Sequence, residues 1–198
     1  MKRLVIIIVV LVLCLNIIPN ITTISVENGF NGAINLISSS DAKEYVVELR
    51  NINISYDMNL LTKSNLTENE YEKMFVNTSM SGLGKAFADA ESETGVNGIY
   101  LASLGCLESS FGRSNFAQTR NNLFGYQSYD SNLDATKVFN SQEEGIIFVA
   151  QKIKKNYLTQ GGAYHSGYTI ASVSKRYASD KEHANKIYSI MKKLVNKL

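Results

Sequence analysis

The chain has 198 residues, which is enough for one ordinary domain and an additional segment at one end. Hydrophobic residues make up 44% of it, so a packed core can form and disorder throughout the chain is excluded. Twenty Lys and Arg against 18 Asp and Glu give a net charge of +2, which excludes a strongly basic nucleic-acid-binding protein. With two Cys and two His, neither a disulfide framework nor a Cys/His metal site is expected, and we expect no metal and no cofactor.

Residues 1–25 have the pattern of a targeting segment. Lys2 and Arg3 supply positive charge, and an unbroken apolar run extends over residues 4–15. This run is shorter than the ~20 residues that span a bilayer, which favours a signal peptide, although no A-x-A-like cleavage site follows. Extended to Ile24, the segment is long enough for a tilted anchor in the cytoplasmic membrane. We expect a cell-wall-associated protein at the cell surface or outside the cell. A cleaved signal peptide and a retained anchor both remain open.

Residues 26–66 are rich in Asn and Ser and predict a spacer or a small accessory lobe. Two stretches, 44–49 and 52–56, alternate between apolar and polar residues, as short strands do. The region is too short and too polar to build a core of its own. Once the targeting segment is set aside, Cys106 is the one remaining cysteine, so no intramolecular disulfide is expected.

Residues 67–198 predict a mainly helical domain. Capping-box patterns begin at Thr67 and at Ser141, and each precedes a run with helical periodicity. Further helices are expected at about residues 83–94, 99–110, 169–177 and 184–194. The helix over 99–110 is apolar on all sides, which predicts the central buried helix. Between Asn121 and Phe139 the pattern changes to short alternating stretches, which favour a small β-hairpin.

Glu108 is the strongest candidate for chemistry, because it lies at the end of the apolar helix. Burial among apolar neighbours favours the protonated form of a carboxyl group, and such a group can deliver a proton to a poor leaving group such as a glycosidic oxygen. A glutamate at a helix end that simply reaches solvent is the alternative. His165 and His183 are expected to be surface residues. They lack neighbouring ligands, so they are not expected to hold a metal.

Three blocks of sequence resemble the bacterial peptidoglycan β-N-acetylglucosaminidases, glycoside hydrolase family 73. They are GIYLASLGCLESSFG at 98–112, NNLFGY at 121–126 and RYASD followed by ANKI at 176–187. The blocks come in the order typical of the family, and the likeness covers about residues 79–198. Lys181 stands where the family usually has Pro, His183 stands where it usually has Tyr, and the hairpin region is short.

The resemblance implies a lysozyme-like, two-lobed fold that cleaves the β-1,4 bond between N-acetylglucosamine and N-acetylmuramic acid in peptidoglycan. It implies Glu108 as the general acid and Tyr177 as a residue that orients the sugar or a water molecule, while an apolar anchor of the last helices is the alternative role for Tyr177. Substrate-binding roles are expected for residues in the hairpin region: Asn122, Phe124, Tyr126 and Asp130.

Three questions stay open at this stage. Asp130 or Asp134 is a candidate second carboxylate, while attack by the sugar's own N-acetyl group would need only one protein acid. A lytic transglycosylase shares the ESxFG-like start and uses a single Glu, although its usual GLMQ segment is replaced here by NNLFG. The third question is whether the protein is a cell-wall-binding protein that has lost catalytic activity.

Overall fold

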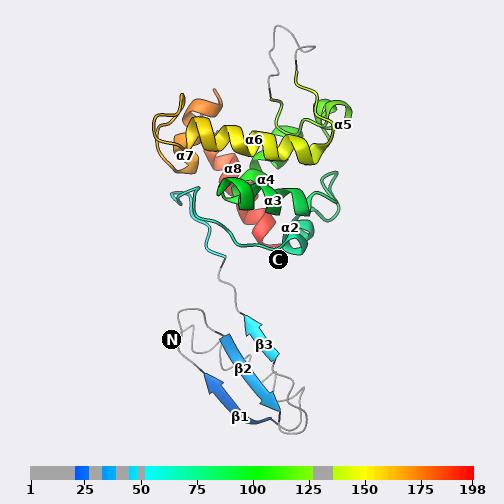
Figure 1. Cartoon of the computed structure of the whole chain (residues 1–198), viewed down its shortest axis with the longest axis vertical. Coiled ribbons are helices and arrows are strands. Elements are labelled where there is room, and N and C mark those ends of the chain that lie inside the picture. The colour runs from blue at the N-terminus through cyan, green and yellow to red at the C-terminus, as the bar shows by residue number, and fades with distance from the viewer. Residues whose placement is uncertain (1–20, 27–32, 39–44, 49–51, 127–135) are drawn as a thin grey trace. The chain divides into compact units, whose positions relative to one another are not determined.

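The computed structural model describes residues 21–26, 33–38, 45–48, 52–126 and 136–198. It divides the chain into two compact units, Met1–Asn51 and Ile52–Leu198 (Figure 1). Residues 1–20, which form most of the predicted targeting segment, lie outside the described residues. No helix in the described ranges is long and apolar enough to cross a membrane.

In its described residues, the first unit contains an antiparallel sheet with the strand order β1-β2-β3. The strands are β1 (Ile21–Val26), β2 (Ala33–Ser38) and β3 (Tyr45–Glu48). The β1–β2 register shifts between Ile21 and Thr23, while β2 and β3 pair without a shift. β3 falls within the alternating stretch 44–49, whereas residues 52–56 form no strand.

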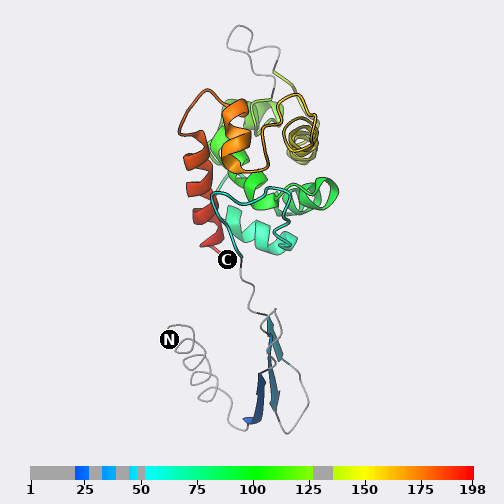
Figure 2. The same cartoon turned by 90° about the vertical axis from the view of Figure 1, so that its left-hand side faces the viewer.

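The second unit is helical. Its described elements are α2 (Glu68–Phe75), α3 (Gly84–Thr94), α4 (Gly98–Ser109), α5 (Asn115–Arg120), α6 (Gln142–Tyr157), α7 (Ile170–Tyr177) and α8 (His183–Val195). α3 packs against α2, α4 and α6, and α8 packs against α4 and α7 (Figures 1 and 2). α4 therefore lies in the middle of the unit, and ten of its 12 residues are buried.

The helices begin where the capping patterns predict. At α2 the capping box is complete, because Thr67 Oγ1 accepts from the Glu70 N–H and the Glu70 carboxylate accepts from the Thr67 N–H at 2.7 Å. At α6 only half of the predicted box forms. Ser141 Oγ accepts from the Glu144 N–H at 3.2 Å, but the Glu144 carboxylate accepts from both the backbone and the side chain of Asn140. Asn140 offers two donors to that carboxylate, so it takes the place of the Ser141 N–H.

The predicted hairpin is not seen in the described parts of its range, residues 121–126 and 136–139, which form turns and irregular chain. Asn122 gives a physical reason. Its side-chain amide donates to the carbonyls of Tyr126 and Lys137 at 3.0 and 2.9 Å, and its Oδ1 accepts from the Tyr126 N–H at 2.9 Å. A buried side chain thus bridges the two segments, and the Lys137 N–H also donates to the Tyr126 carbonyl at 3.3 Å. The rest of the predicted hairpin, 127–135, lies outside the described residues.

Residues 52–66 pack on the helical unit, although the sequence pattern groups them with the spacer. Leu60 and Leu66 are buried in the core. The Leu60 N–H donates to the Tyr168 carbonyl at 2.8 Å, and the Leu60 carbonyl accepts from the Asn97 N–H at 2.8 Å. The helical unit accordingly begins at Ile52, before the capping box at Thr67.

A buried carboxylate on α3 joins three segments of this unit. Glu91 Oε1 accepts from the backbone N–H groups of Ser64 and Gly98 at 2.6 and 2.8 Å. Its Oε2 accepts from the hydroxyls of Ser64 and Tyr71 at 2.8 and 3.3 Å. Gly98 is required at this junction, because a Cβ there would overlap with the Tyr71 hydroxyl. Glu91 thus fixes the start of α4 against α2 and α3.

Candidate active site

Glu108 occupies the last turn of α4, and the chain after it reverses sharply. Ser110, Phe111 and Gly112 have successive φ values of 52°, 60° and 83°, in the left-handed region. Ser109 holds this reversal, because its Oγ donates to the Gly105 carbonyl and accepts from the Gly112 N–H at 2.7 Å. The helix therefore ends immediately beyond Glu108.

Gly112 also allows a close approach of two chain segments. A Cβ at this position would lie 2.9 Å from the carbonyl carbon and oxygen of Ser79, closer than real side chains come. The side-chain amide of Gln118 donates to the Gly112 carbonyl at 2.6 Å and secures the same turn from the other side. The Gly and Ser residues that follow Glu108 are thus explained by the tight turn that they form.

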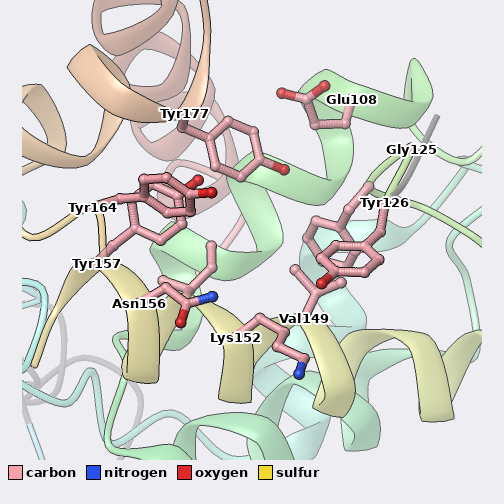
Figure 3. Close-up of a pocket in the computed structure, with 11 residues that line it drawn as sticks. Glu108, Gly125, Tyr126, Val149, Lys152, Asn156, Tyr157, Tyr164 and Tyr177 are labelled. Carbon is pink, nitrogen blue, oxygen red and sulfur yellow. The ribbon is translucent and has the colours of Figure 1, made fainter. Parts of the chain in front are cut away.

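Glu108 borders a cavity of about 500 Å³, which falls within the size range of small-ligand sites. In Figure 3, Glu108 and Tyr177 lie on one side and α6 lies on the opposite side, with Tyr126 at one end and Tyr157 and Tyr164 at the other. The lining residues are Glu108, Phe124, Gly125, Tyr126, Val149, Lys152, Ile153, Asn156, Tyr157, Tyr164 and Tyr177. Among them Glu108 is the one carboxylate and Lys152 the one cation.

The surroundings of Glu108 differ from the purely apolar site that its sequence neighbours predict. Its side chain is 27% exposed, on the cavity side of α4. Its Oε1 lies 3.0 Å from Nε2 of His183, the first residue of α8. The apolar residues of α4 pack inward, so their sequence proximity does not place them around the carboxyl group.

The prediction that His183 is a surface residue is wrong. The residue is 4% exposed and connects Glu108 to Ser174, whose Oγ lies 2.9 Å from Nδ1 of the imidazole. Its ring also stacks on Tyr177, with ring centroids 5.5 Å apart and an interplanar angle of 24°. The packing of α8 against α4 and α7 brings His183 next to Glu108, Ser174 and Tyr177. A local sequence pattern could not predict these contacts.

Tyr177, predicted at the site, lines the cavity beside Glu108. Figure 3 shows its hydroxyl directed into the cavity. Burial, together with the negative charge of Glu108, raises the pKa of this hydroxyl well above its usual value. The phenol therefore stays protonated and able to donate a hydrogen bond throughout the neutral and moderately alkaline range.

The predicted substrate-binding residues separate in the structure. Phe124 and Tyr126 line the cavity. Asn122 does not, because it is 1% exposed and its amide is taken up by the turn described above. Asp130 lies outside the described residues, as does Asp134.

Sequence reasoning missed the contribution of α6. Val149, Lys152, Ile153 and Asn156 recur with helical spacing and form one wall of the cavity. The apolar members of this face were visible in the periodicity, but nothing in the pattern distinguished a cavity wall from core. At one end Tyr157 packs against Tyr164, and at the other Tyr126 packs on Phe148.

Lys152 faces the cavity with its charge close to aromatic rings. Its Nζ lies 4.9 Å from the centroid of the Phe148 ring, and Lys137 Nζ lies 5.0 Å from the same centroid. Two cations thus flank one aromatic ring beside the cavity. In the described part of the chain, no group of three or more His, Cys, Asp or Glu residues is placed to hold a metal ion.

Comparison with known proteins assigns the part of the chain that forms this cavity to a family. Residues 84–196 match the model of the mannosyl-glycoprotein endo-β-N-acetylglucosaminidase family, a family of glycoside hydrolases. The chain belongs to this family. The matched range begins at α3 and contains all of the cavity-lining residues.

Two relatives in Streptococcus pneumoniae, from strains TIGR4 and R6, share the description "Putative endo-beta-N-acetylglucosaminidase". Each is 32% identical over 145 residues, which cover 70% of this chain and 22% and 20% of the two relatives. The chain therefore spans about a fifth of the length of these relatives.

Among solved structures, the chain resembles Staphylococcus aureus autolysin E in complex with a muropeptide, with a TM-score of 0.58 and 23% identity over 86% of each chain. A catalytic mutant of autolysin E in complex with the disaccharide NAG-NAM gives a TM-score of 0.59 with 22% identity, over 92% of this chain and 88% of that one. This likeness establishes a shared, mainly helical fold.

Proposed function

We propose that this protein is a peptidoglycan hydrolase that cleaves the β-1,4 bond between N-acetylglucosamine and N-acetylmuramic acid. The observation that carries the proposal is Glu108, the one carboxylate among the described residues that line the cavity, in a chain of the glucosaminidase family. The NAG-NAM disaccharide bound by autolysin E, which shares the fold, supports this substrate.

Glu108 acts as the general acid. Its carboxyl proton passes to the glycosidic oxygen as the bond from that oxygen to the anomeric carbon breaks, and the departing sugar leaves as an alcohol. A water molecule completes the hydrolysis at the anomeric carbon and returns a proton. Partial exposure of Glu108 toward the cavity lets the carboxyl group reach the substrate, while α4 keeps its backbone fixed.

Tyr177, which lines the cavity beside Glu108, orients the reacting group. Its protonated hydroxyl, directed into the cavity, donates to the N-acetyl oxygen of the sugar or to the attacking water. Attack by the sugar's own N-acetyl group needs only the one protein acid, Glu108, with Tyr177 donating to the attacking oxygen. Replacement of Asp130 and of Asp134 by Asn tests the alternative of a second protein carboxylate.

The rest of the cavity suits a glycan strand. The rings of Tyr126, Tyr157 and Tyr164 offer apolar faces for sugar rings, and Tyr164 is 49% exposed at the rim. The ammonium group of Lys152 is placed to attract the carboxylates of the lactyl-peptide substituent on N-acetylmuramic acid. Lys137 adds a second positive charge near the same Phe148 ring, so the strand orientation that brings carboxylates to this ring is favoured.

Export places the domain at its substrate. Residues 1–25 carry the signal or anchor, and the part of the predicted 26–66 spacer that precedes the helical unit, residues 26–51, tethers that unit at the wall. In intact cells stripped of their wall, added protease should remove the C-terminal part of the chain. Complete protection of that part would contradict this placement.

The deciding experiment is digestion of purified peptidoglycan by the full chain, followed by borohydride reduction and mass spectrometry of the released fragments. The proposal predicts N-acetylglucosamine at the new reducing ends and no product with the Glu108→Gln variant. Reduced N-acetylmuramic acid would identify a muramidase, and 1,6-anhydromuramic ends a lytic transglycosylase. Binding without release of fragments would identify a wall-binding protein. Any of these three results would overturn the proposal.

A further inference from the structure

The contact between His183 and Glu108 goes beyond the family pattern, which usually has Tyr at position 183. The imidazole is enclosed at both edges and on one face. Nε2 lies 3.0 Å from Glu108 Oε1, and Nδ1 lies 2.9 Å from Ser174 Oγ. Tyr177 stacks on the ring face. An imidazole can bridge two partners through its two nitrogens, whereas a single phenol hydroxyl at the end of a ring does not have this geometry.

We propose that His183 is the residue that positions Glu108 for proton transfer. It holds Oε1 by a hydrogen bond from its Nε2–H, so that the other carboxyl oxygen, Oε2, is the one that carries the proton into the cavity. This inference rests on the proposed function, because it assigns the orientation of the same general acid.

Ser174 sets the tautomer on which the proposal depends. A neutral imidazole carries one N–H, and its other nitrogen accepts a hydrogen bond. A serine hydroxyl can donate or accept, whereas Glu108 Oε1 is an acceptor both in the carboxylate and in a carboxyl group protonated at Oε2. The proposed arrangement has the Ser174 hydroxyl donating to Nδ1 and the Nε2–H donating to Oε1, which gives both ring nitrogens a partner and leaves Oε2 to carry the proton.

Burial makes this bond effective as a constraint. His183 and Ser174 are 4% and 6% exposed, so water competes little for either nitrogen. Both residues are fixed by helices, Ser174 within α7 and His183 at the first position of α8. The carboxyl group of Glu108 is the mobile member, on a side chain with three rotatable bonds. Fixing one of its oxygens selects the orientation needed for proton transfer, and small misplacements of a reacting group cost large factors in rate.

The test compares steady-state kinetics of full-chain variants on soluble peptidoglycan fragments. His183→Phe keeps a ring on Tyr177 but removes both nitrogens, and we expect kcat to fall about 10- to 100-fold with KM within about twofold. His183→Gln places an amide N–H near the position of Nε2, so it should recover part of kcat. Ser174→Ala leaves the imidazole in place and should lower kcat about threefold to tenfold by releasing its tautomer. Ser172→Ala, on the same helix with its hydroxyl 2.9 Å from Thr169 Oγ1, is the matched control and should leave kcat unchanged.

The outcomes separate this proposal from the proposed function. If the unmodified chain does not release fragments, the proposed function fails and the positioning role fails with it. If it does, native kcat in His183→Phe or in Ser174→Ala refutes the positioning role alone. A rise in KM without a fall in kcat would place His183 in substrate binding and would also refute it. If His183→Phe does not fold, as judged by thermal unfolding, Ser174→Ala and His183→Gln decide the question.

Discussion

Two glutamates on adjacent helices of this protein show how the surroundings of a carboxyl group decide its role. Glu91 is 4% exposed and accepts four hydrogen bonds, two from backbone N–H groups and two from hydroxyls. Glu108 has a side chain that is 27% exposed at a cavity, and within the described structure it contacts His183 Nε2 through Oε1 at 3.0 Å. A carboxylate whose oxygens are filled by protein donors holds the fold together, whereas one with an oxygen facing a cavity can react with a ligand.

The largest expected effect is on catalysis at Glu108. Glu108→Gln keeps the size of the side chain and an oxygen that accepts from His183, but it removes the transferable proton. We expect kcat on peptidoglycan to fall at least about 10²- to 10⁴-fold, the usual contribution of general acid catalysis. The melting temperature should stay level or rise, because no hydrogen bond to the fold is lost. Near-native turnover would refute the catalytic role of Glu108 and the contrast between Glu108 and Glu91.

The converse is expected at Glu91. Glu91→Leu fills a similar volume but leaves the part-buried Ser64 N–H and the buried Gly98 N–H without the Glu91 acceptor. At about 1–3 kcal/mol for each of these two unsatisfied groups, the free energy of unfolding should fall by about 2–6 kcal/mol. Denaturant unfolding measures the loss, and the folded fraction should retain native kcat.

Glu91→Gln is the control for that change. Its amide oxygen can still accept from both backbone N–H groups, and the hydroxyls of Ser64 and Tyr71 can turn to accept from the amide. Its loss of stability should therefore be smaller than that of Glu91→Leu. Alkylation of Cys106 provides an independent probe, since burial raises the pKa of this thiol to about 12 and the native protein should react slowly. Equal stability of the unmodified chain, Glu91→Leu and Glu91→Gln would show that Glu91 does not stabilise the fold.

Tyr177→Phe tests whether the tyrosine beside Glu108 belongs to the reactive region. The change keeps the ring contacts with His183 and Tyr157 and removes only the hydroxyl in the cavity. Loss of one hydrogen bond made in the transition state, worth about 1.4 kcal/mol, should lower kcat about tenfold at an unchanged melting temperature. If kcat is native, Tyr177 is only an anchor of α7.

Lys152→Met tests the electrostatic side of the cavity. Met keeps an apolar stem beside Phe148 and removes the charge, so KM for peptide-bearing fragments should rise about threefold to tenfold with kcat little changed, as for a modest ion-pair contribution. Fragments without peptide or lactyl carboxylates should bind both proteins alike. The expected effect should shrink with added salt. An equal change for both kinds of fragment would argue against charge recognition.

The smallest effect is expected at Tyr100, which lies on α4 like Glu108 but faces the core. Its hydroxyl is buried and has no hydrogen-bond partner in the described part of the chain. Tyr100→Phe should leave the free energy of unfolding unchanged or raise it by up to about 1 kcal/mol, because an unsatisfied polar group is removed. Thermal unfolding measures this, and kcat should remain native. A marked destabilisation would mean that the hydroxyl has a partner.

Local sequence determined much of this protein. The Thr67 capping box, the left-handed stop at Gly95 and the periodicity of the apolar residues predicted most helices of the second unit, because each depends on contacts between residues close in the chain. The resemblance in three blocks located Glu108, Tyr177 and the cavity residues Phe124 and Tyr126. α5 was missed because its six residues are too few and too polar to show a period.

Tertiary structure decided the rest, because the deciding contacts join residues far apart in the sequence. Glu91 lies on a helix with an ordinary amphipathic pattern, and only packing against Ser64 and Gly98 turns it into a buried junction. His183 lies 75 residues from Glu108, and a polar residue at a helix start is normally exposed. The contacts of α8 with α4 and α7 bring His183 within hydrogen-bonding distance of the Glu108 carboxyl group. Periodicity reports which face of a helix is covered, but it does not report which side chain of another helix covers it.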